Sequence, residues 1–258
     1  MDTTTFKRLQ YDIIARLTQV GLLSGKLDEL LGRHLASQHE NLNSLMSDPL
    51  FKEKDFAEIA AQMGYRTISQ VTELGKKDPE LVSKIYRQMQ LKLQHGFLTV
   101  ELKLYSEIYP SITLSSLAIM AFAVFEQSLS LVCSALADMH NLKLGLPDLA
   151  GHSTLEKAQC YFTRVLGLKI EFARSSKWQR IKGHQDVRNL LAHNGGFLDD
   201  SERSERIAKF VKSNKVGLRI EKGTLQIDKV YVEKLVNDIQ EWLIDLFDLI
   251  DSQSKAAS

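Results

Sequence analysis

The chain has 258 residues, with 33 Lys and Arg against 32 Asp and Glu and a formal net charge of +1. This balance excludes a protein that coats nucleic acid or a membrane surface through overall basicity. An intrinsically disordered chain is excluded too, since 44% of the residues are hydrophobic and 25% are charged. Only 14 Gly and 4 Pro argue against a turn-rich, all-β architecture.

Several features favour a reduced, cytoplasmic protein. Cys133 and Cys160 form no CxxC pair and lie in apolar stretches typical of buried thiols. The start of the chain carries charges where a secretory signal needs an apolar core. In the apolar segment 112–137, the longest charge-free apolar part is Leu117–Phe125, shorter than the ~20 residues of a membrane span. We therefore expect no membrane contact.

The first hundred residues read as helical. Apolar residues recur at helical spacing over 6–23 and 22–31, and a polar stretch at 38–55, which contains Asp48-Pro49, predicts a connection. Further helical pieces are predicted at 56–63, 68–74 and 81–93. We treat 1–104 as an N-terminal helical region without an assigned function.

The central part begins with a predicted loop at Tyr109-Pro110-Ser111. The helix expected at 113–139 is apolar on nearly every face, which is typical of a central core helix. Ser153 or Thr154 can cap the next helix, which Gly167 ends. Its expected buried stripe consists of Leu155, Ala158, Tyr161, Phe162, Val165 and Leu166. One more helix, 178–193, is followed by Asn194-Gly195-Gly196.

In the last part of the chain, the spacing of apolar residues changes from helical to alternating. Alternating apolar residues on either side of Glu221-Lys222-Gly223 predict a β-hairpin at 215–228. A helix at 230–250 and a fraying tail at 252–258 follow. The predicted fold is mainly α: a helical bundle over 105–251 that contains the small hairpin and is preceded by the helical extension.

Arg188, Asn189 and His193 form the one constellation that indicates chemistry. Asn189 and His193 lie four residues apart and share a helix face, which the long Arg188 side chain can reach. Arginine binds phosphate oxygens with its forked donors, and histidine transfers protons near neutral pH. Asparagine can hold a phosphate or a sugar hydroxyl. These residue types indicate a phosphodiester site.

The surrounding segment is basic. Between 169 and 193, six basic residues stand against two acidic ones, a local net charge of about +4 that is typical of a polyanion site. Candidate RNA-binding residues are Arg174, Lys177, Arg180 and Lys182. Phe172 and Trp178 could stack on bases, although Trp178 is more typical of a core position. A plain solvated basic face is the alternative. His184, on another helix face from His193, is expected at the surface.

At these residues the chain resembles the HEPN domains. Arg188-Asn189-x-x-x-His193 matches the R-N-x-x-x-H form of their motif. The segment 122–129 with Glu126 looks like the long HEPN helix whose buried acidic residue often faces the motif. The helix at 151–168, Trp178 and the Asn194-Gly-Gly turn also look like bacterial and phage-associated members. The resemblance covers about 105–250.

This resemblance implies a metal-independent endoribonuclease of bacterial antiphage defence or toxin–antitoxin systems. Two copies would dimerise so that their motifs face a shared cleft, and the RNA would be cut by attack of its own 2′-hydroxyl. His193 would assist proton transfer, Arg188 would stabilise the phosphate and Asn189 would position groups. Glu126 and Asp186 would support them. No metal or cofactor is implied, and an antitoxin or another defence protein is a possible partner.

Three alternatives remain open. The motif can be purely structural, or the domain can be a non-catalytic module that binds RNA or a partner protein. Residues 56–74 resemble a helix-turn-helix, with Ala60 four residues before Gly64, and such a unit would make the chain a DNA-binding regulator. We favour a plain helical hairpin for that segment, because its second helix is short and the apolar spacing after Gly64 is imperfect.

Overall fold

The computed structural model describes residues 3–52, 55, 58, 61–62, 67–170, 172, 174–214 and 216–256. It is mostly helical with one two-stranded antiparallel sheet, so the predicted mainly α fold is confirmed. The chain forms two compact units. Unit 1 comprises Met1–Asp28 and Ser111–Ser258, and unit 2 comprises Glu29–Pro110. This division differs from a boundary at residue 104, because the first turns of the chain pack with its C-terminal part.

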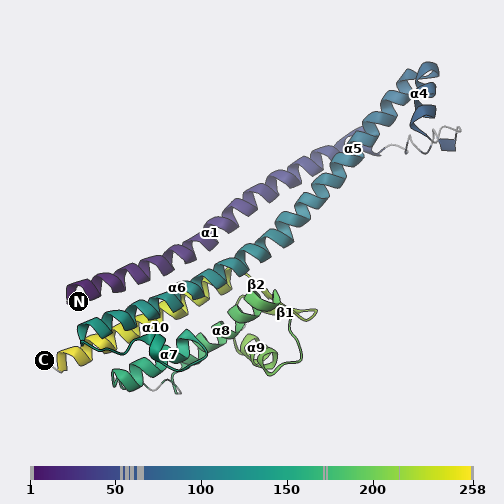
Figure 1. The fold of residues 1–258 in the computed structure, drawn as a ribbon. Helices are drawn as coiled ribbons and strands as arrows, with labels where there is room; N and C mark the ends of the chain where they lie inside the picture. Colours follow the sequence, from purple (N-terminus) through teal and green to yellow (C-terminus); the bar gives the residue numbers. More distant parts are fainter. Residues whose placement is uncertain are drawn as a thin grey trace. The chain divides into compact units, whose positions relative to one another are not determined.

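Helix α1 (Thr3–Ser47) contributes to both units (Figure 1). It continues through the first half of the connection predicted at 38–55. Leu42 and Leu45 keep an apolar, half-buried face there, so the polar neighbours simply cover the solvent side. The helix ends at Ser47, just before Asp48-Pro49, so residues 38–47 of the predicted connection are helical, and the short α2 (Pro49–Lys52) follows.

Unit 2 continues with α4 (Ile68–Lys77) and α5 (Pro79–Lys103). The Thr67 side chain accepts a hydrogen bond from the backbone N–H of Gln70 and thereby caps α4. Asp78 caps α5, with Pro79 at the first helical position. Most of the predicted helix at 56–63, and residues 63–66 in the predicted helix-turn-helix at 56–74, lie outside the described residues.

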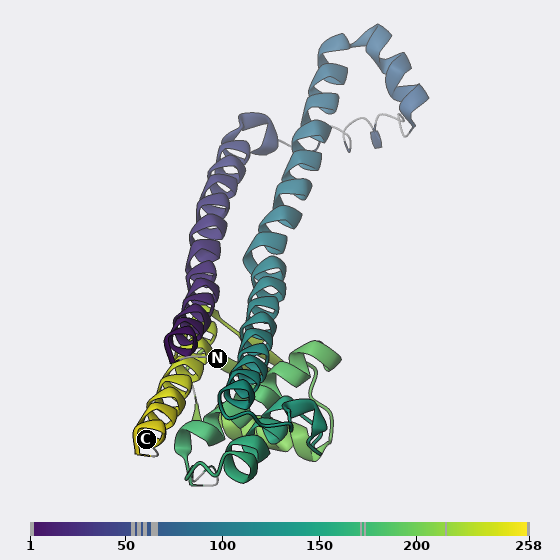
Figure 2. The same ribbon diagram turned by 60° about the vertical axis from the view of Figure 1, so that its left-hand side comes forward.

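The predicted loop at Tyr109-Pro110-Ser111 is wrong. A π-helical turn, η1 (Leu104–Ile108), joins α5 directly to α6 (Tyr109–Met139), and the backbone N–H of Tyr109 donates to the carbonyl of Leu104. The widened turn accommodates Pro110, which has no N–H and would clash with a carbonyl of a regular α-helix. Figure 2 shows this run of helix without a break.

The core of unit 1 surrounds α6. Twelve of its side chains are buried, Phe122 and Phe125 completely. Phe125 packs edge-on against Trp242, whose ring lies 5.1 Å from that of Trp178. The first turns of α1 join the same core, because Phe6 packs against Phe247. This aromatic cluster holds α1, α6, α8 and α10 together.

The elements after α6 lie around this core (Figures 1 and 2). They are η2 (Leu146–Asp148), α7 (Thr154–Cys160), the π-helical turn η3 (Tyr161–Val165), α8 (Ser176–Asn194), α9 (Glu202–Ser213), β1 (Leu218–Glu221), β2 (Thr224–Ile227) and α10 (Lys229–Ala256). Ser153 caps α7 as predicted. Four of the six stripe residues in 154–166 are buried, while Val165 and Leu166 are half-buried.

The predicted hairpin is confirmed. Leu218 pairs with Ile227 and Glu221 with Thr224, and the turn residues Lys222 and Gly223 both have positive φ, as a tight two-residue hairpin turn requires. Helix α10 extends to Ala256, so residues 252–256 of the predicted tail are helical. Among the described residues, one helical stretch, Pro79–Met139, is long and apolar enough to cross a membrane by length and composition alone, a test that soluble core helices also pass.

Candidate functional site

Helix α8 carries the predicted motif. The Ser175 side chain caps its start by accepting from the backbone N–H of Trp178, and Gly195 ends it in the left-handed conformation with φ 57°. Asn194-Gly195-Gly196 therefore ends the helix as predicted, because glycine adopts positive φ without a steric cost. His193 lies in the last turn, next to this end.

Arg188 is held between two helices. Its Nη2 forms an ion pair with the Glu126 carboxylate of α6, and its Nη1 donates to Asn189 Oδ1 at 2.9 Å. The guanidinium carbon lies 5.4 Å from the centre of the Phe122 ring, a cation–π arrangement. The Nε atom is buried and has no hydrogen-bond partner among the described residues. The structure thus brings together Arg188, Asn189 and Glu126.

His193 differs from Arg188 in its surroundings. Its side chain is exposed, and it makes no hydrogen bond or ion pair within the described part of the chain. Lys182, Asn189 and His193 are separated by seven and four residues, so they follow one face of α8, and Lys182 is exposed as well. An exposed imidazole on the face that carries Asn189 is open to a ligand from solvent.

The segment after the motif is anchored to the hairpin. The backbone N–H of Leu225 donates to the Gly196 carbonyl at 2.8 Å, and Phe197 forms a β-bridge with Thr224. This pairing leaves the Phe197 side chain 65% exposed, four residues after His193. The sequence prediction did not include Phe197 as a stacking surface. An aromatic residue directly after the glycine pair could have indicated it.

Two of the four predicted RNA-binding residues are engaged elsewhere. Lys177 Nζ lies 2.6 Å from Asp245 Oδ2, and Arg180 Nε lies 3.1 Å from Asp238 Oδ1. Because carboxylates of α10 balance these two cations, the local charge of the segment does not form an uncompensated basic patch. Lys182 and Arg174 are exposed.

Two further expectations are wrong. Phe172 belongs to the aromatic cluster of the core and is 3% exposed, so it cannot stack on a base. Trp178 is 1% exposed and lies in the core, the position that the sequence favoured for it. Asp186 forms an ion pair with Arg206, Nε to Oδ2 at 3.1 Å, and thereby ties α8 to α9 rather than to the motif. The geometry offers Asp186 no contact with Arg188 or His193.

His184, expected at the surface, is 2% exposed and lies in a buried polar network. Its Nε2 lies 3.0 Å from Asp238 Oδ2 and its Nδ1 lies 3.2 Å from the Tyr231 hydroxyl. Asp238 also accepts from Lys234 and Arg180. Three side chains on α8 and α10, those of Arg180, His184 and Lys234, therefore converge on one buried carboxylate, which fixes the motif helix against α10.

The protonation states follow from this arrangement. Burial alone would raise the pKa of Asp238, but hydrogen bonds from His184 and Lys234 hold this pKa at about 2. Burial lowers the pKa of His184, although the hydrogen bond to Asp238 opposes the shift. At neutral pH, His184 is uncharged; its Nε2–H donates to Asp238 and its Nδ1 accepts from the Tyr231 hydroxyl. Burial also raises the pKa of Tyr231.

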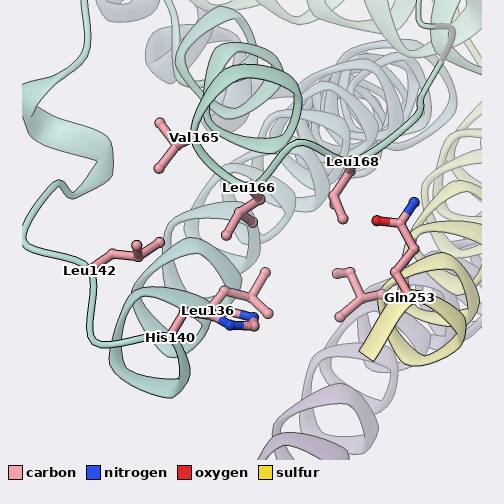
Figure 3. A pocket seen from close by; sticks show the side chains of 8 residues that line it. Leu136, His140, Leu142, Val165, Leu166, Leu168 and Gln253 are labelled. Carbon is pink, nitrogen blue, oxygen red and sulfur yellow. The ribbon is translucent and has the colours of Figure 1, made fainter. Parts of the chain in front are cut away.

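A cavity of about 310 Å³ lies elsewhere in unit 1 (Figure 3). Leu136 and His140 line it from α6 and its C-terminal end, and Gln253 lines it from α10. No residue of the motif lines this cavity. No group of three or more His, Cys, Asp or Glu side chains that could hold a metal ion occurs among the residues that the structure describes.

Comparisons of the chain with protein-family models, curated proteins and solved structures found no match. The function is therefore argued from the site itself and from the resemblance of its motif.

Proposed function

We propose that this protein is a metal-independent endoribonuclease of the HEPN type, and that Arg188, Asn189 and His193 form its active site. The observation that carries the proposal is that one helix contains both a half-buried, oriented Arg188 and, five residues later in its last turn, an exposed His193. This combination separates two tasks. The arginine is pre-positioned for a phosphate, and the histidine stays accessible for proton transfer.

The ion pair with Glu126 leaves Arg188 able to bind an anion. A guanidinium has five N–H donors, and one hydrogen on each Nη atom is directed to Glu126 or Asn189. The second hydrogen on each Nη remains for phosphate oxygens. Glu126 and the Phe122 ring restrict the orientation of the guanidinium, so little entropy is lost when a phosphate binds. We assign Glu126 as a positioning residue.

The proposed reaction needs only proton transfer and charge stabilisation. The ribose 2′-oxygen attacks the adjacent phosphorus, the bond from phosphorus to the 5′-oxygen breaks, and the products are a 2′,3′-cyclic phosphate and a 5′-hydroxyl. One base takes the proton of the 2′-hydroxyl, and one acid gives a proton to the leaving 5′-oxygen. In the dimer that the HEPN resemblance implies, His193 of each copy serves one of these roles, while Arg188 stabilises the charge on the phosphorane oxygens.

Substrate contacts follow from the same face. Lys182 is exposed on the helix face that contains Asn189 and His193, and Phe197 is exposed four residues after His193 in sequence. A lysine on this face binds backbone phosphate, and an exposed aromatic ring stacks on an unpaired base. We therefore assign a single-stranded RNA segment as the substrate. The biological setting implied by the resemblance is bacterial defence or a toxin–antitoxin pair in the cytoplasm.

The test is RNA cleavage in the presence of EDTA. Purified protein is incubated with a panel of RNAs that includes tRNA. We expect His193→Ala and Arg188→Ala to reduce cleavage by roughly 100-fold or more, the usual share of a proton-transfer residue. His152→Ala is the matched control, because His152 is also exposed but lies outside α8. Its activity should equal that of the wild type.

Two outcomes would argue against the proposal. One is a wild-type protein that leaves every RNA intact and also fails to arrest growth when it is expressed in bacteria. The other is binding of RNA that is retained without cleavage under all conditions, which would assign the site to the non-catalytic module. Circular dichroism of each variant excludes loss of activity through unfolding.

A further inference from the structure

Helix α5 carries a second apolar face in addition to the one that packs in unit 2. We call it the outer stripe; it consists of Tyr86, Met89, Leu93, Phe97, Val100 and, in η1, Ile108. The exposed fractions of these side chains range from 41% to 73%, and Phe97 is the most exposed. In a helix with a single packing partner, these positions would be polar.

The outer stripe faces away from the helix that packs on α5. The inner face of α5 contacts the C-terminal half of α1 and the segment after it: Gln88 Nε2 donates to the Leu50 carbonyl at 3.0 Å, and the Tyr105 ring lies 3.9 Å from that of His34. From Tyr86 to Val100 the stripe residues are separated by three or four positions, which keeps them on one side of an α-helix, and Ile108 follows eight residues later. The stripe is therefore straight, and it extends over roughly 33 Å.

The exposed apolar area of the outer stripe is large for the surface of a monomer. With ordinary side-chain areas, the exposed parts of the stripe amount to roughly 600 Å² per chain, the upper limit of apolar patches on monomers. Two such stripes in contact would bury roughly 1,200 Å², the size at which specific protein interfaces begin. A second copy of this helix is thus sufficient to cover the stripe.

Gly96 provides space on α5 for a side chain of a second copy. It lies in the interior of α5 beside Phe97, where glycine is less favourable than alanine. A Cβ atom at Gly96 would meet no other atom within 4 Å, so packing within the chain does not require the glycine. Gly96 has no side chain next to the most exposed aromatic ring of the stripe, so a side chain of a second copy can approach the helix backbone there.

We propose that the outer stripe is a self-association surface on which a second copy packs its own α5 in antiparallel orientation. In the register that places Phe97 of one copy over Gly96 of the other, Leu93 lies opposite Val100. Met89 then lies opposite Leu104, and Tyr86 lies opposite Glu107, one residue from Ile108. A parallel pair would set Phe97 against Phe97 and Gly96 against Gly96. This contact does not depend on the proposed nuclease activity.

The first test is the association state of the full chain by analytical ultracentrifugation. Leu93→Glu is compared with Leu30→Glu, because these two leucines of unit 2 are 62% and 63% exposed and only Leu93 belongs to the stripe. We expect Leu93→Glu to weaken self-association at least 100-fold and Leu30→Glu to leave it unchanged. Equal association constants for the two variants would overturn the proposal.

Cysteine cross-linking tests the geometry, and it separates this contact from a dimer formed through the motif. In a Cys160→Ser background, a mixture of Leu93→Cys and Val100→Cys chains should form a disulfide-linked heterodimer. Each variant alone should cross-link at least 10-fold less. Preferential cross-linking of Leu93→Cys to itself would overturn the antiparallel arrangement. Cross-links that form in a preparation without RNA cleavage would support this contact and contradict only the proposed function.

Vesicles of phosphatidylcholine and phosphatidylglycerol provide the remaining test. A chain that stays monomeric at high concentration and binds these vesicles only while Phe97 is intact would assign the stripe to a lipid surface and overturn the proposal. Absence of vesicle binding, together with Leu93-dependent association, supports it.

Discussion

The Asp238→Asn substitution tests how α8, the motif helix, is held on α10. The carboxylate is 1% exposed and accepts from His184 at 3.0 Å, from Arg180 at 3.1 Å and from Lys234. An amide has one acceptor oxygen and no charge, so it cannot satisfy three donors or balance two cations. The NH2 group of the introduced asparagine would also point at hydrogen-bond donors of His184, Arg180 or Lys234.

The size of the effect follows from burial. Removing one partner of a buried ion pair costs about 3–5 kcal/mol. Arg180 and Lys234 are 28% and 37% exposed and regain part of their hydration, so we expect the lower end, about 3 kcal/mol. Asp245→Asn is the control, because Asp245 also pairs α10 with a basic residue of α8, here Lys177, but is 57% exposed. It should cost less than about 1 kcal/mol.

Urea unfolding followed by tryptophan fluorescence measures this difference. The two tryptophans of the chain, Trp178 and Trp242, both lie in the core of unit 1, so the signal reports unfolding of that unit. If Asp238→Asn and Asp245→Asn lower the free energy of unfolding equally, the buried network does not hold the motif helix and this reasoning is wrong.

Two other predictions concern stability. Gly183→Ala should destabilise unit 1 by about 1–3 kcal/mol, because a Cβ there would lie 2.2 Å from the Phe210 ring. Gly32→Ala, in open space on α1, should instead stabilise its helix by about 0.5–1 kcal/mol; similar urea midpoints for both variants would contradict this contrast. Acidification should also destabilise the protein. The folded-state pKa values of His184 and Asp238 lie below their ordinary values of 6.5 and 3.8, so the unfolded chain binds protons first. Stability is complete above pH 6.5 and declines toward pH 2; a melting temperature that stays constant from pH 7 to 3 would refute this.

The parts of the fold that depend on local sequence could be predicted. Ser153 caps α7, Gly195 ends α8, and the turn at Lys222-Gly223 joins the two strands. In each case one residue or one pair determines the backbone conformation, and its neighbours are sufficient to recognise it. The contact of Glu126 with Arg188 joins residues 62 positions apart, and it could be predicted only because the resemblance included both helices.

The parts that depend on contacts across the chain could not be predicted. His184 looked exposed because its acceptor, Asp238, lies 54 residues away. Arg180 and Lys177 looked like a basic patch, since their carboxylate partners lie on α10. The loop expected at Pro110 is a π-helical turn, because the energetic cost of a proline in a helix can be relieved by one extra residue in the preceding turn.

The proposed reaction cuts RNA by attack of its own 2′-hydroxyl. The most direct measurement compares one RNA with the same sequence made of 2′-O-methyl nucleotides, both incubated with wild-type protein in EDTA. We predict cleavage of the RNA alone, with fragments that end in 2′,3′-cyclic phosphate and 5′-hydroxyl groups, and loss of these fragments in His193→Ala. Equal cleavage of both strands, or cleavage of the RNA that persists in His193→Ala, would contradict the assignment.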